Sequence, residues 1–164
     1  MKLYHGTNHD IDTINLTAGK RFKDFGQGFY LTPNKATAER MARKKAKMFG
    51  GEPLILEYEF NAEQAEEIKL KMKKFPEKAN AEWIRFIDRN RDRHSGATPH
   101  QYDIVTGPIA DDGVVVQLTN YKNEILTPEE AASRLQDKYL DQQYYFGTPK
   151  ALELLKKTHV WKIN

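Results

Sequence analysis

The chain has 164 residues, of which 39% are hydrophobic and 30% charged, and its net charge at neutral pH is +3. This composition is typical of a soluble globular domain and argues against a chain that is disordered throughout. The absence of cysteine excludes disulfides, thiolate zinc sites and cysteine nucleophiles. The five histidines show no spacing typical of metal ligands, so we expect no metal site.

The N-terminal residues MKLYHGT lack the apolar run of a signal peptide, and no later stretch is apolar enough to cross a membrane. We therefore expect a cytoplasmic protein with no membrane partner. Basic residues gather at 43–47, 69–74 and 85–93. Such stretches are most often solvated helix faces, and a surface for nucleic acid or an acidic partner is the less common alternative.

The N-terminal part of the chain predicts a short strand at residues 2–5, followed by a polar loop through residue 24. Residues 25–32 (FGQGFYLT) read as a glycine-hinged turn into a short strand. A helix is expected from about 34 to 49, with Ala38, Met41, Ala42, Lys45 and Phe49 at helical spacing and two glycines after it.

The middle of the chain predicts one strand at 53–61 and two helices. Asn61 and Gln64 are spaced as a capping box for a helix from 62 to about 74. The second helix is expected at about 79–93, with its buried face supplied by large apolar side chains.

The C-terminal part predicts a helix at about 127–138, because Thr127 can cap it, Pro128 fits its first position and Glu130 completes a capping box. The other elements expected here are strands at 102–110, 114–118, 142–146 and 158–163, a turn at 111–113, and a helix that begins at Thr148-Pro149.

Strands and helices are interspersed without a regular βαβ rhythm, which favours an α+β fold over a doubly wound sheet. No repeat or flexible linker divides the chain. We expect one domain over residues 1–164, with an inserted helical segment at about 62–93.

The first of three segments with chemical potential is His5-Gly6 at the end of the first strand. A lone histidine in such a place is more often a packing or hydrogen-bonded residue than a functional one. A following glycine, however, lets the backbone approach a ligand closely. Its N–H and C=O groups match a flat amide such as nicotinamide.

The other two segments place aromatic and polar side chains on strands. In 24–32, Phe29 and Tyr30 point to opposite faces if extended, so one ring packs inward and the other is offered to a ligand. Residues 141–146 are either an ordinary β-rich strand with one polar end or a strand that turns one glutamine, Gln142 or Gln143, into a cleft. Strand alternation makes these two positions mutually exclusive.

Together, a strand ending in HGT, the segment FGQGFYLT before an Ala-rich helix, and a late polar-aromatic strand resemble the ADP-ribosyltransferases of the diphtheria-toxin and poly(ADP-ribose) polymerase type. That superfamily carries a His, Tyr, Glu set on three separated strands of a split mixed β-sheet with flanking helices. The segments YDIVTGPIADD (102–112) and QYYFGT (143–148) look like a bacterial branch of it, over residues 2 to about 157.

The resemblance implies that NAD is the co-substrate and that His5, Tyr30 and Gln143 form the catalytic set. His5 would form a hydrogen bond with one of the two riboses of NAD. The Gly6 backbone would pair with the nicotinamide amide, and Tyr30 would stack on the nicotinamide ring. The NAD-binding residues implied are His5, Gly6, Thr7, Gly28, Phe29, Tyr30 and Thr32.

Gln143 falls where the superfamily has its glutamate. A glutamate holds the ribose 2′-hydroxyl and stabilises the positive charge that develops as the nicotinamide–ribose bond breaks. Glutamine can hold the hydroxyl but brings no charge and cannot act as a general base. Transfer of a single ADP-ribose is therefore expected in place of polymer synthesis.

Other side chains are candidates for the charges that the site needs. Asp103 and Asp112 are possible replacement carboxylates, although turn capping is the commoner role of such residues. Lys20, Arg21 and Lys23 are equally well explained as partners of the NAD pyrophosphate or as solvated loop charges.

The expected function is mono-ADP-ribosylation of a macromolecule, a protein or a nucleic acid, in the cytosol. A role as a bacterial toxin or phage-defence effector, with an antitoxin protein that masks the cleft, follows from the resemblance alone. The alternative is a module of the same fold that binds NAD or ADP-ribose without catalysis, which the glutamine favours.

Overall fold

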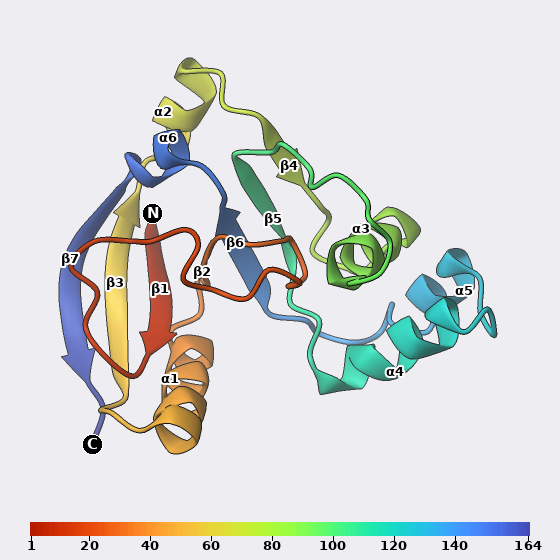
Figure 1. Ribbon diagram of the computed structural model, residues 1–164, viewed down its shortest axis with the longest axis horizontal. Helices are drawn as coiled ribbons and strands as arrows, with labels where there is room; N and C mark the ends of the chain where they lie inside the picture. The colour runs from red at the N-terminus through yellow and green to blue at the C-terminus, as the bar shows by residue number, and fades with distance from the viewer.

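Two β-sheets that meet along strands β1 and β2 form the centre of the molecule (Figure 1). The computed structural model describes residues 1–164. One sheet is antiparallel in the order β1-β3-β7, and the other is mixed in the order β2-β6-β5-β4, with β4 and β5 parallel. The strands are β1 (Lys2–Thr7), β2 (Phe29–Leu31), β3 (Leu54–Phe60), β4 (Met72–Lys74), β5 (Ile104–Pro108), β6 (Gln142–Phe146) and β7 (Leu155–Lys162).

The junction between the sheets is narrow. Tyr4 donates its N–H to the Thr32 carbonyl at 2.8 Å and accepts from the Thr32 N–H at 2.9 Å. This isolated bridge is where β1 and β2 are joined. The expected α+β class is confirmed, and the predicted strands at 2–5, 53–61 and 142–146 correspond to β1, β3 and β6.

Six helices flank the sheets, with α1 lying against β1 and the group α3, α4 and α5 lying beyond β4 and β5 (Figure 1). None of them is long and apolar enough to cross a membrane. The helices are α1 (Lys35–Phe49), α2 (Ala62–Glu67), α3 (Ala81–Arg91), α4 (Asp112–Lys122), α5 (Pro128–Ser133) and α6 (Pro149–Leu152).

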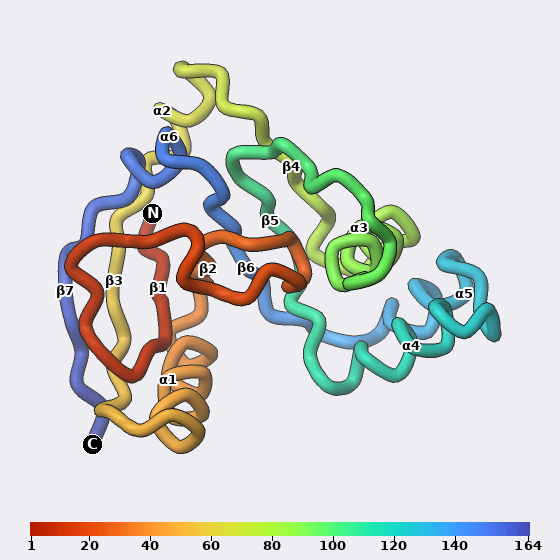
Figure 2. The backbone as a smooth tube through the Cα atoms, viewed as in Figure 1, coloured from red at the N-terminus to blue at the C-terminus, as the bar shows by residue number.

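The long loop between β1 and β2 crosses both sheets (Figure 2). It is tied to β7 by Lys157, whose Nζ donates to Asp10 Oδ1 at 2.9 Å and to the Ile11 carbonyl at 2.8 Å. At its far end Phe25 is fully buried in the hydrophobic cluster formed with α3, α4 and α5. The loop therefore links the two halves of the molecule.

Two hydrophobic clusters stabilise the two halves. One lies between the sheets and includes Leu3, Leu56 and Phe146. The other joins the faces of α3, α4 and α5 to the second sheet and includes Trp83 and Val105, both fully buried. Fully burying side chains of this size contributes about 1.5–3 kcal/mol each.

Helix α1 begins and ends as predicted. The Asn34 side chain accepts from the N–H groups of Ala36 and Thr37, and Gly50 ends the helix with a positive φ of 77°. The expected buried face is only partly right. Ala38 and Ala42 are buried, whereas Met41 and Phe49 are exposed by 43% and 67%.

The predicted strand at 114–118 is wrong, because these residues lie in helix α4. The Asp111 side chain accepts from the Val114 N–H and caps the helix, so the predicted turn at 111–113 is a helix start. Val114 and Leu118, four residues apart, are both buried. The cap and the burial of Val114 and Leu118 have overridden the β preference of three consecutive valines, of which Val115 and Val116 are exposed.

The helix predicted from 62 to about 74 is also too long. Asn61 caps α2 by accepting from the Gln64 N–H, without the reciprocal bond of a capping box. Helix α2 ends at Glu67, and Lys69 adopts a positive φ of 55°. Strand β4 follows and pairs with β5, so the segment 62–93 is not wholly helical. The helix predicted at 127–138 has its capping box but ends at Ser133.

Candidate functional site

A cavity of about 210 Å³ lies at the junction of β1 and β2. It brings together His5, Gly6, Tyr30, Thr32 and Gln143, five of the predicted site residues, from three segments that are far apart in the sequence. The other residues that line it are Tyr4, Lys23, Leu31, Met41, Lys44, Lys45 and Ile109.

His5 is held as a neutral imidazole with one defined tautomer. Its Nδ1 lies 2.7 Å from the Tyr30 carbonyl oxygen, which only accepts, so Nδ1 carries the hydrogen. Burial, reinforced by the Lys45 charge, lowers the pKa of His5 to about 3. The remaining nitrogen, Nε2, is an acceptor that lies 3.5 Å from Lys45 Nζ.

Gly6 is required by the packing of α1 against β1. A Cβ atom at this position would lie 2.0 Å from the Ala38 carbonyl oxygen and 2.8 Å from the Ala42 nitrogen. Tyr4 directs its N–H and C=O to Thr32, and strand alternation turns those of Gly6 toward the same edge. The glycine therefore serves helix packing and at the same time leaves its backbone groups facing the cavity.

Tyr30 lines the cavity, and its hydroxyl already makes two hydrogen bonds within the protein. The hydroxyl donates to the Gly26 carbonyl at 2.6 Å and accepts from the Phe25 N–H at 3.0 Å. Burial raises the pKa of this phenol far above its usual value, so it does not act as a base at neutral pH. Lys23 places its Nζ 4.9 Å from the centre of the ring, within the range of a cation–π contact.

The lining of the cavity is cationic, because it includes Lys23, Lys44 and Lys45 and no carboxylate. Lys45 Nζ donates to the Gly6 carbonyl oxygen at 2.8 Å. Burial, and then the nearby Lys23 charge, lower the pKa of Lys45 to about 8. Burial and the charge of Lys20 likewise lower the pKa of Lys23. An anionic ligand group would relieve this repulsion.

Gln143 is the glutamine that faces the cavity. Its side chain is buried, and its Nε2 donates to Asp24 Oδ2 and to the Pro108 carbonyl. Gln142 points the other way, where its Nε2 donates to the carbonyls of Glu77 and Leu140. The alternative left open by strand alternation is thereby decided.

Three predicted NAD-binding residues lie outside the cavity lining. Thr7 is buried, with its hydroxyl donating to the His9 carbonyl at 3.1 Å. Phe29 is buried, and its ring stacks on His5 with 4.5 Å between ring centres. Gly28 is needed because a Cβ atom there would lie 2.4 Å from Tyr145 Cε2. Of the three, Phe29 supports the cavity from behind through its contact with His5.

The replacement carboxylates considered from the sequence do not reach the cavity. Asp103 accepts from the Lys71 N–H and the Thr148 hydroxyl, both at 2.7 Å, and ties β5 to its neighbours. Asp112 is exposed in the first turn of α4. Among the basic residues of the preceding loop, only Lys23 lines the cavity.

Sequence reasoning missed two residues at this site. Lys45 was expected on the buried face of α1, without a functional role, and it contacts Gly6. Asp24 directly precedes the glycine turn, and its buried carboxylate accepts from Gln143 and forms an ion pair with Arg91. The only local signal was a charged residue next to a buried aromatic segment.

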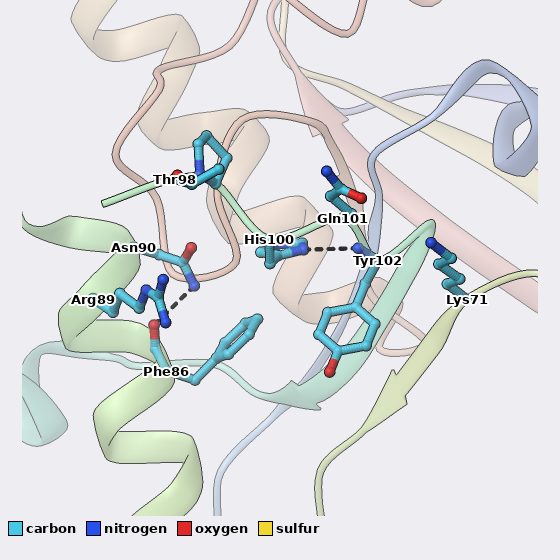
Figure 3. A pocket seen from close by; sticks show the side chains of 9 residues that line it. Lys71, Phe86, Arg89, Asn90, Thr98, His100, Gln101 and Tyr102 are labelled. Atoms are coloured by element: carbon cyan, nitrogen blue, oxygen red, sulfur yellow. Dashed lines mark hydrogen bonds between the residues drawn. The ribbon is translucent and has the colours of Figure 1, made fainter. Parts of the chain in front are cut away.

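A larger cavity, of about 490 Å³, lies between α3 and the chain before β5 (Figure 3). His100 stands in its wall, but both ring nitrogens are used. Nε2 lies 2.6 Å from the Phe25 carbonyl oxygen, and Nδ1 accepts from the Tyr102 N–H at 3.1 Å. His100 therefore anchors the segment next to Asp24, and its ring has no free nitrogen for chemistry.

The model of one protein family, described as "Protein of unknown function (DUF3990)", matches residues 1–157. No curated protein and no solved structure matches the chain.

Proposed function

The chain belongs to the DUF3990 family, and we propose that it is an NAD-dependent ADP-ribosyltransferase that transfers single ADP-ribose units to a macromolecule. The observation that carries the proposal is the single cavity lined by His5, Gly6, Tyr30 and Gln143. These are the residues through which the sequence resembles the ADP-ribosyltransferases. The split between the two sheets at β1 and β2 agrees with the split sheet of that superfamily.

The size of the cavity suits one half of the dinucleotide. Sites for drug-sized ligands usually measure about 300–1,000 Å³. At about 210 Å³, this cavity would hold nicotinamide and its ribose, with the rest of NAD outside. Lys44 and Lys23 at the rim would then meet the pyrophosphate.

Two lysine contacts mark where nicotinamide would bind. Lys23 places a cation over the Tyr30 ring, and the nicotinamide ring of NAD is itself a flat cation. Lys45 donates to the Gly6 carbonyl, which is the contact expected for the carboxamide N–H. Both lysine side chains would move aside on binding, and the phosphates of NAD provide the partners that draw them away.

The chemistry asked of the residues is modest. The bond of NAD that must break joins ribose to nicotinamide, and nicotinamide is a good leaving group. Gln143 would orient the ribose through the Gln143 amide oxygen. The Nε2 atom of neutral His5 would accept a hydrogen bond from a ribose hydroxyl. Since no carboxylate lines the cavity, a deprotonating base for chain elongation is lacking, which favours transfer of single units.

We extend the proposal to a role as a toxin or phage-defence effector in the bacterial cytoplasm, held in check by an antitoxin protein that covers the cavity. Support would come from a neighbouring-gene product that co-purifies with the chain and blocks NAD access. Overexpression without any effect on growth would count against this role, while leaving the enzymatic proposal standing.

The decisive experiment is mass spectrometry of cell extract incubated with the protein and labelled NAD. Nuclease and protease treatment then assigns the label to nucleic acid or protein. We expect His5→Ala and Tyr30→Ala to abolish labelling, and His94→Ala and Tyr139→Ala, at exposed positions away from the cavity, to retain it. Equal labelling by the parent and both cavity variants would overturn the site assignment.

A second candidate is a module that holds NAD or ADP-ribose without turnover, and the uncharged Gln143 favours it. Nicotinamide release separates the two functions. Saturable binding of NAD with no release of nicotinamide over hours would establish the binding module and exclude the enzyme.

A further inference from the structure

We propose that Asp24 is a positioning residue for Gln143, which it holds with the amide oxygen toward the cavity and which it polarises through a charged hydrogen bond. The inference rests on the proposed function of the same cavity. It places the negative charge of the site one hydrogen bond behind the cavity wall, on a residue from a different segment of the chain.

The hydrogen bonds fix the orientation of the amide. Gln143 Nε2 lies 3.0 Å from Asp24 Oδ2 and 3.1 Å from the Pro108 carbonyl oxygen. A backbone carbonyl can only accept, so the NH₂ group must lie on this side. Both amide hydrogens are then used. The amide oxygen, Oε1, accepts no hydrogen bond from the protein and remains available to a ligand hydroxyl.

Both carboxylate oxygens of Asp24 accept hydrogen bonds from the protein. Its Oδ1 accepts from Arg91 Nε at 2.7 Å and Nη2 at 2.5 Å, and its Oδ2 accepts from the Ala110 N–H at 3.3 Å and from Gln143. A carboxylate, which only accepts, matches this arrangement. Asparagine would turn its NH₂ group toward Arg91 or toward Gln143, and one of the two bonds would be lost.

The backbone around Asp24 is held just as firmly. Asn90 Nδ2 donates to the Asp24 carbonyl at 3.1 Å, and His100 Nε2 to the Phe25 carbonyl at 2.6 Å. Figure 3 shows Asn90 and His100 side by side in the cavity wall between α3 and the second sheet. The Phe25 N–H donates to the Tyr30 hydroxyl. The position of the carboxylate is therefore set before any ligand binds.

This arrangement explains why glutamine is suited to position 143. The pocket around its Nε2 consists of two acceptors, Asp24 and the Pro108 carbonyl. A glutamate would place one oxygen against both of them, and the repulsion between two neighbouring carboxylates would favour a protonated pair. The glutamine amide satisfies both acceptors. Its bond to an ionised partner draws electron density toward Oε1, as hydrogen bonds in a chain polarise one another.

The test is a double-mutant cycle on nicotinamide release from NAD, with wild type, Asp24→Asn, Gln143→Ala and the double variant. We expect Asp24→Asn to lower kcat by about 10–100-fold, as for other residues that orient a functional group. KM for NAD should change by less than about threefold, because the bond is made through Gln143 and not to the bound ligand. In the Gln143→Ala background, Asp24→Asn should change kcat by less than about twofold.

A matched control is Asp103→Asn, which removes a hydrogen-bonded carboxylate outside the cavity. It should lower stability and leave kcat unchanged. If Asp103→Asn lowers kcat as much as Asp24→Asn, or if the two changes of the cycle are additive, Asp24 acts through the fold and not through Gln143, and the inference fails.

A second readout needs no turnover. In nuclear magnetic resonance spectra of the free protein, the Gln143 side-chain NH₂ signals should be shifted by the charged bond and exchange slowly with water. They should become solvent-like in Asp24→Asn. Solvent-like signals in the wild type, or identical signals in both, would overturn the inference. If the wild type releases no nicotinamide, the enzymatic proposal fails, while these signals still decide whether Asp24 holds Gln143.

Discussion

The two walls of the cavity are built differently. The β1 wall, formed by His5 and Gly6, contacts the Lys45 side chain of α1, which a ligand could displace. The β6 wall, formed by Gln143 with Asp24 behind it, is fixed by an ion pair and a set of backbone hydrogen bonds. Under the proposed function, the β1 wall controls which ligand enters, whereas the β6 wall holds its functional group in place in advance.

The largest effect is expected where the β1 wall meets α1. In Gly6→Ala, the new Cβ would lie 2.0 Å from the Ala38 carbonyl oxygen, and relief is difficult because the nearest atoms all belong to the α1 backbone. We expect the free energy of unfolding to fall by about 3 kcal/mol or more, the upper range for overpacking. Urea denaturation measures this loss. Gly19→Ala, whose Cβ would have nothing closer than 3.5 Å, is the control and should be nearly neutral.

The next effect tests the rigidity of the β6 wall. Arg91→Ala leaves the buried Asp24 carboxylate without its ion-pair partner, so we expect a loss of about 2–4 kcal/mol of unfolding free energy. Arg43→Ala removes an exposed pair with Glu39 on α1 and should cost less than about 1 kcal/mol. Similar losses in the two variants would show that the β6 wall is no more fixed than the surface.

A third prediction concerns how stability changes with pH through His5 in the β1 wall. The pKa of folded His5 is about 3, below the unfolded value near 6.5, so protonation favours the unfolded chain as pH falls. The contribution of His5 to the free energy of unfolding is therefore complete above about pH 6.5. It falls by about 1.4 kcal/mol per pH unit between 6.5 and 3. His5→Asn keeps a donor for the Tyr30 carbonyl without this titration. Between pH 6.5 and 4.5, the wild type should therefore lose about 2 kcal/mol more unfolding free energy than His5→Asn. Denaturation series at several pH values measure this difference.

If the wild type and His5→Asn lose stability in parallel over that range, His5 is not held neutral. The other histidines and the carboxylates titrate alike in both proteins, so their contributions cancel in the comparison.

The smallest effect tests whether Lys45 occupies the position proposed for nicotinamide. Lys45→Met frees the Gly6 carbonyl and removes a competing cation, so free nicotinamide should bind about 3–10-fold more tightly, the effect of one hydrogen bond. ADP-ribose, which carries phosphates, should bind more weakly. Calorimetry or ligand-detected spectra measure both. Lys47→Met, exposed on the same helix, should change neither. Unchanged nicotinamide binding would show that Lys45 does not block the site.

The local part of the fold was predictable where chemistry and periodicity agreed. The helix start at Asn34, the caps at Asn61 and Thr127 and the strand before Asn61 are all present, although that strand is buried on both faces and does not alternate. The errors fall where distant partners decide the outcome. Three valines became part of a helix because Asp111 caps it and because Val114 and Leu118 pack into the cluster with α3 and α5. Residues 72–74 became a strand because β5 offers an edge.

The sequence by itself determined the α+β class, the separation of the three segments and their candidate residues, because these depend on neighbours along the chain. Only the tertiary structure decided that Gln143 and not Gln142 faces the cavity, and that Gly6 serves the packing of α1. It alone brought Asp24 and Lys45 to the site. These contacts join residues up to 119 positions apart, and nothing in local periodicity specifies which buried polar groups will meet.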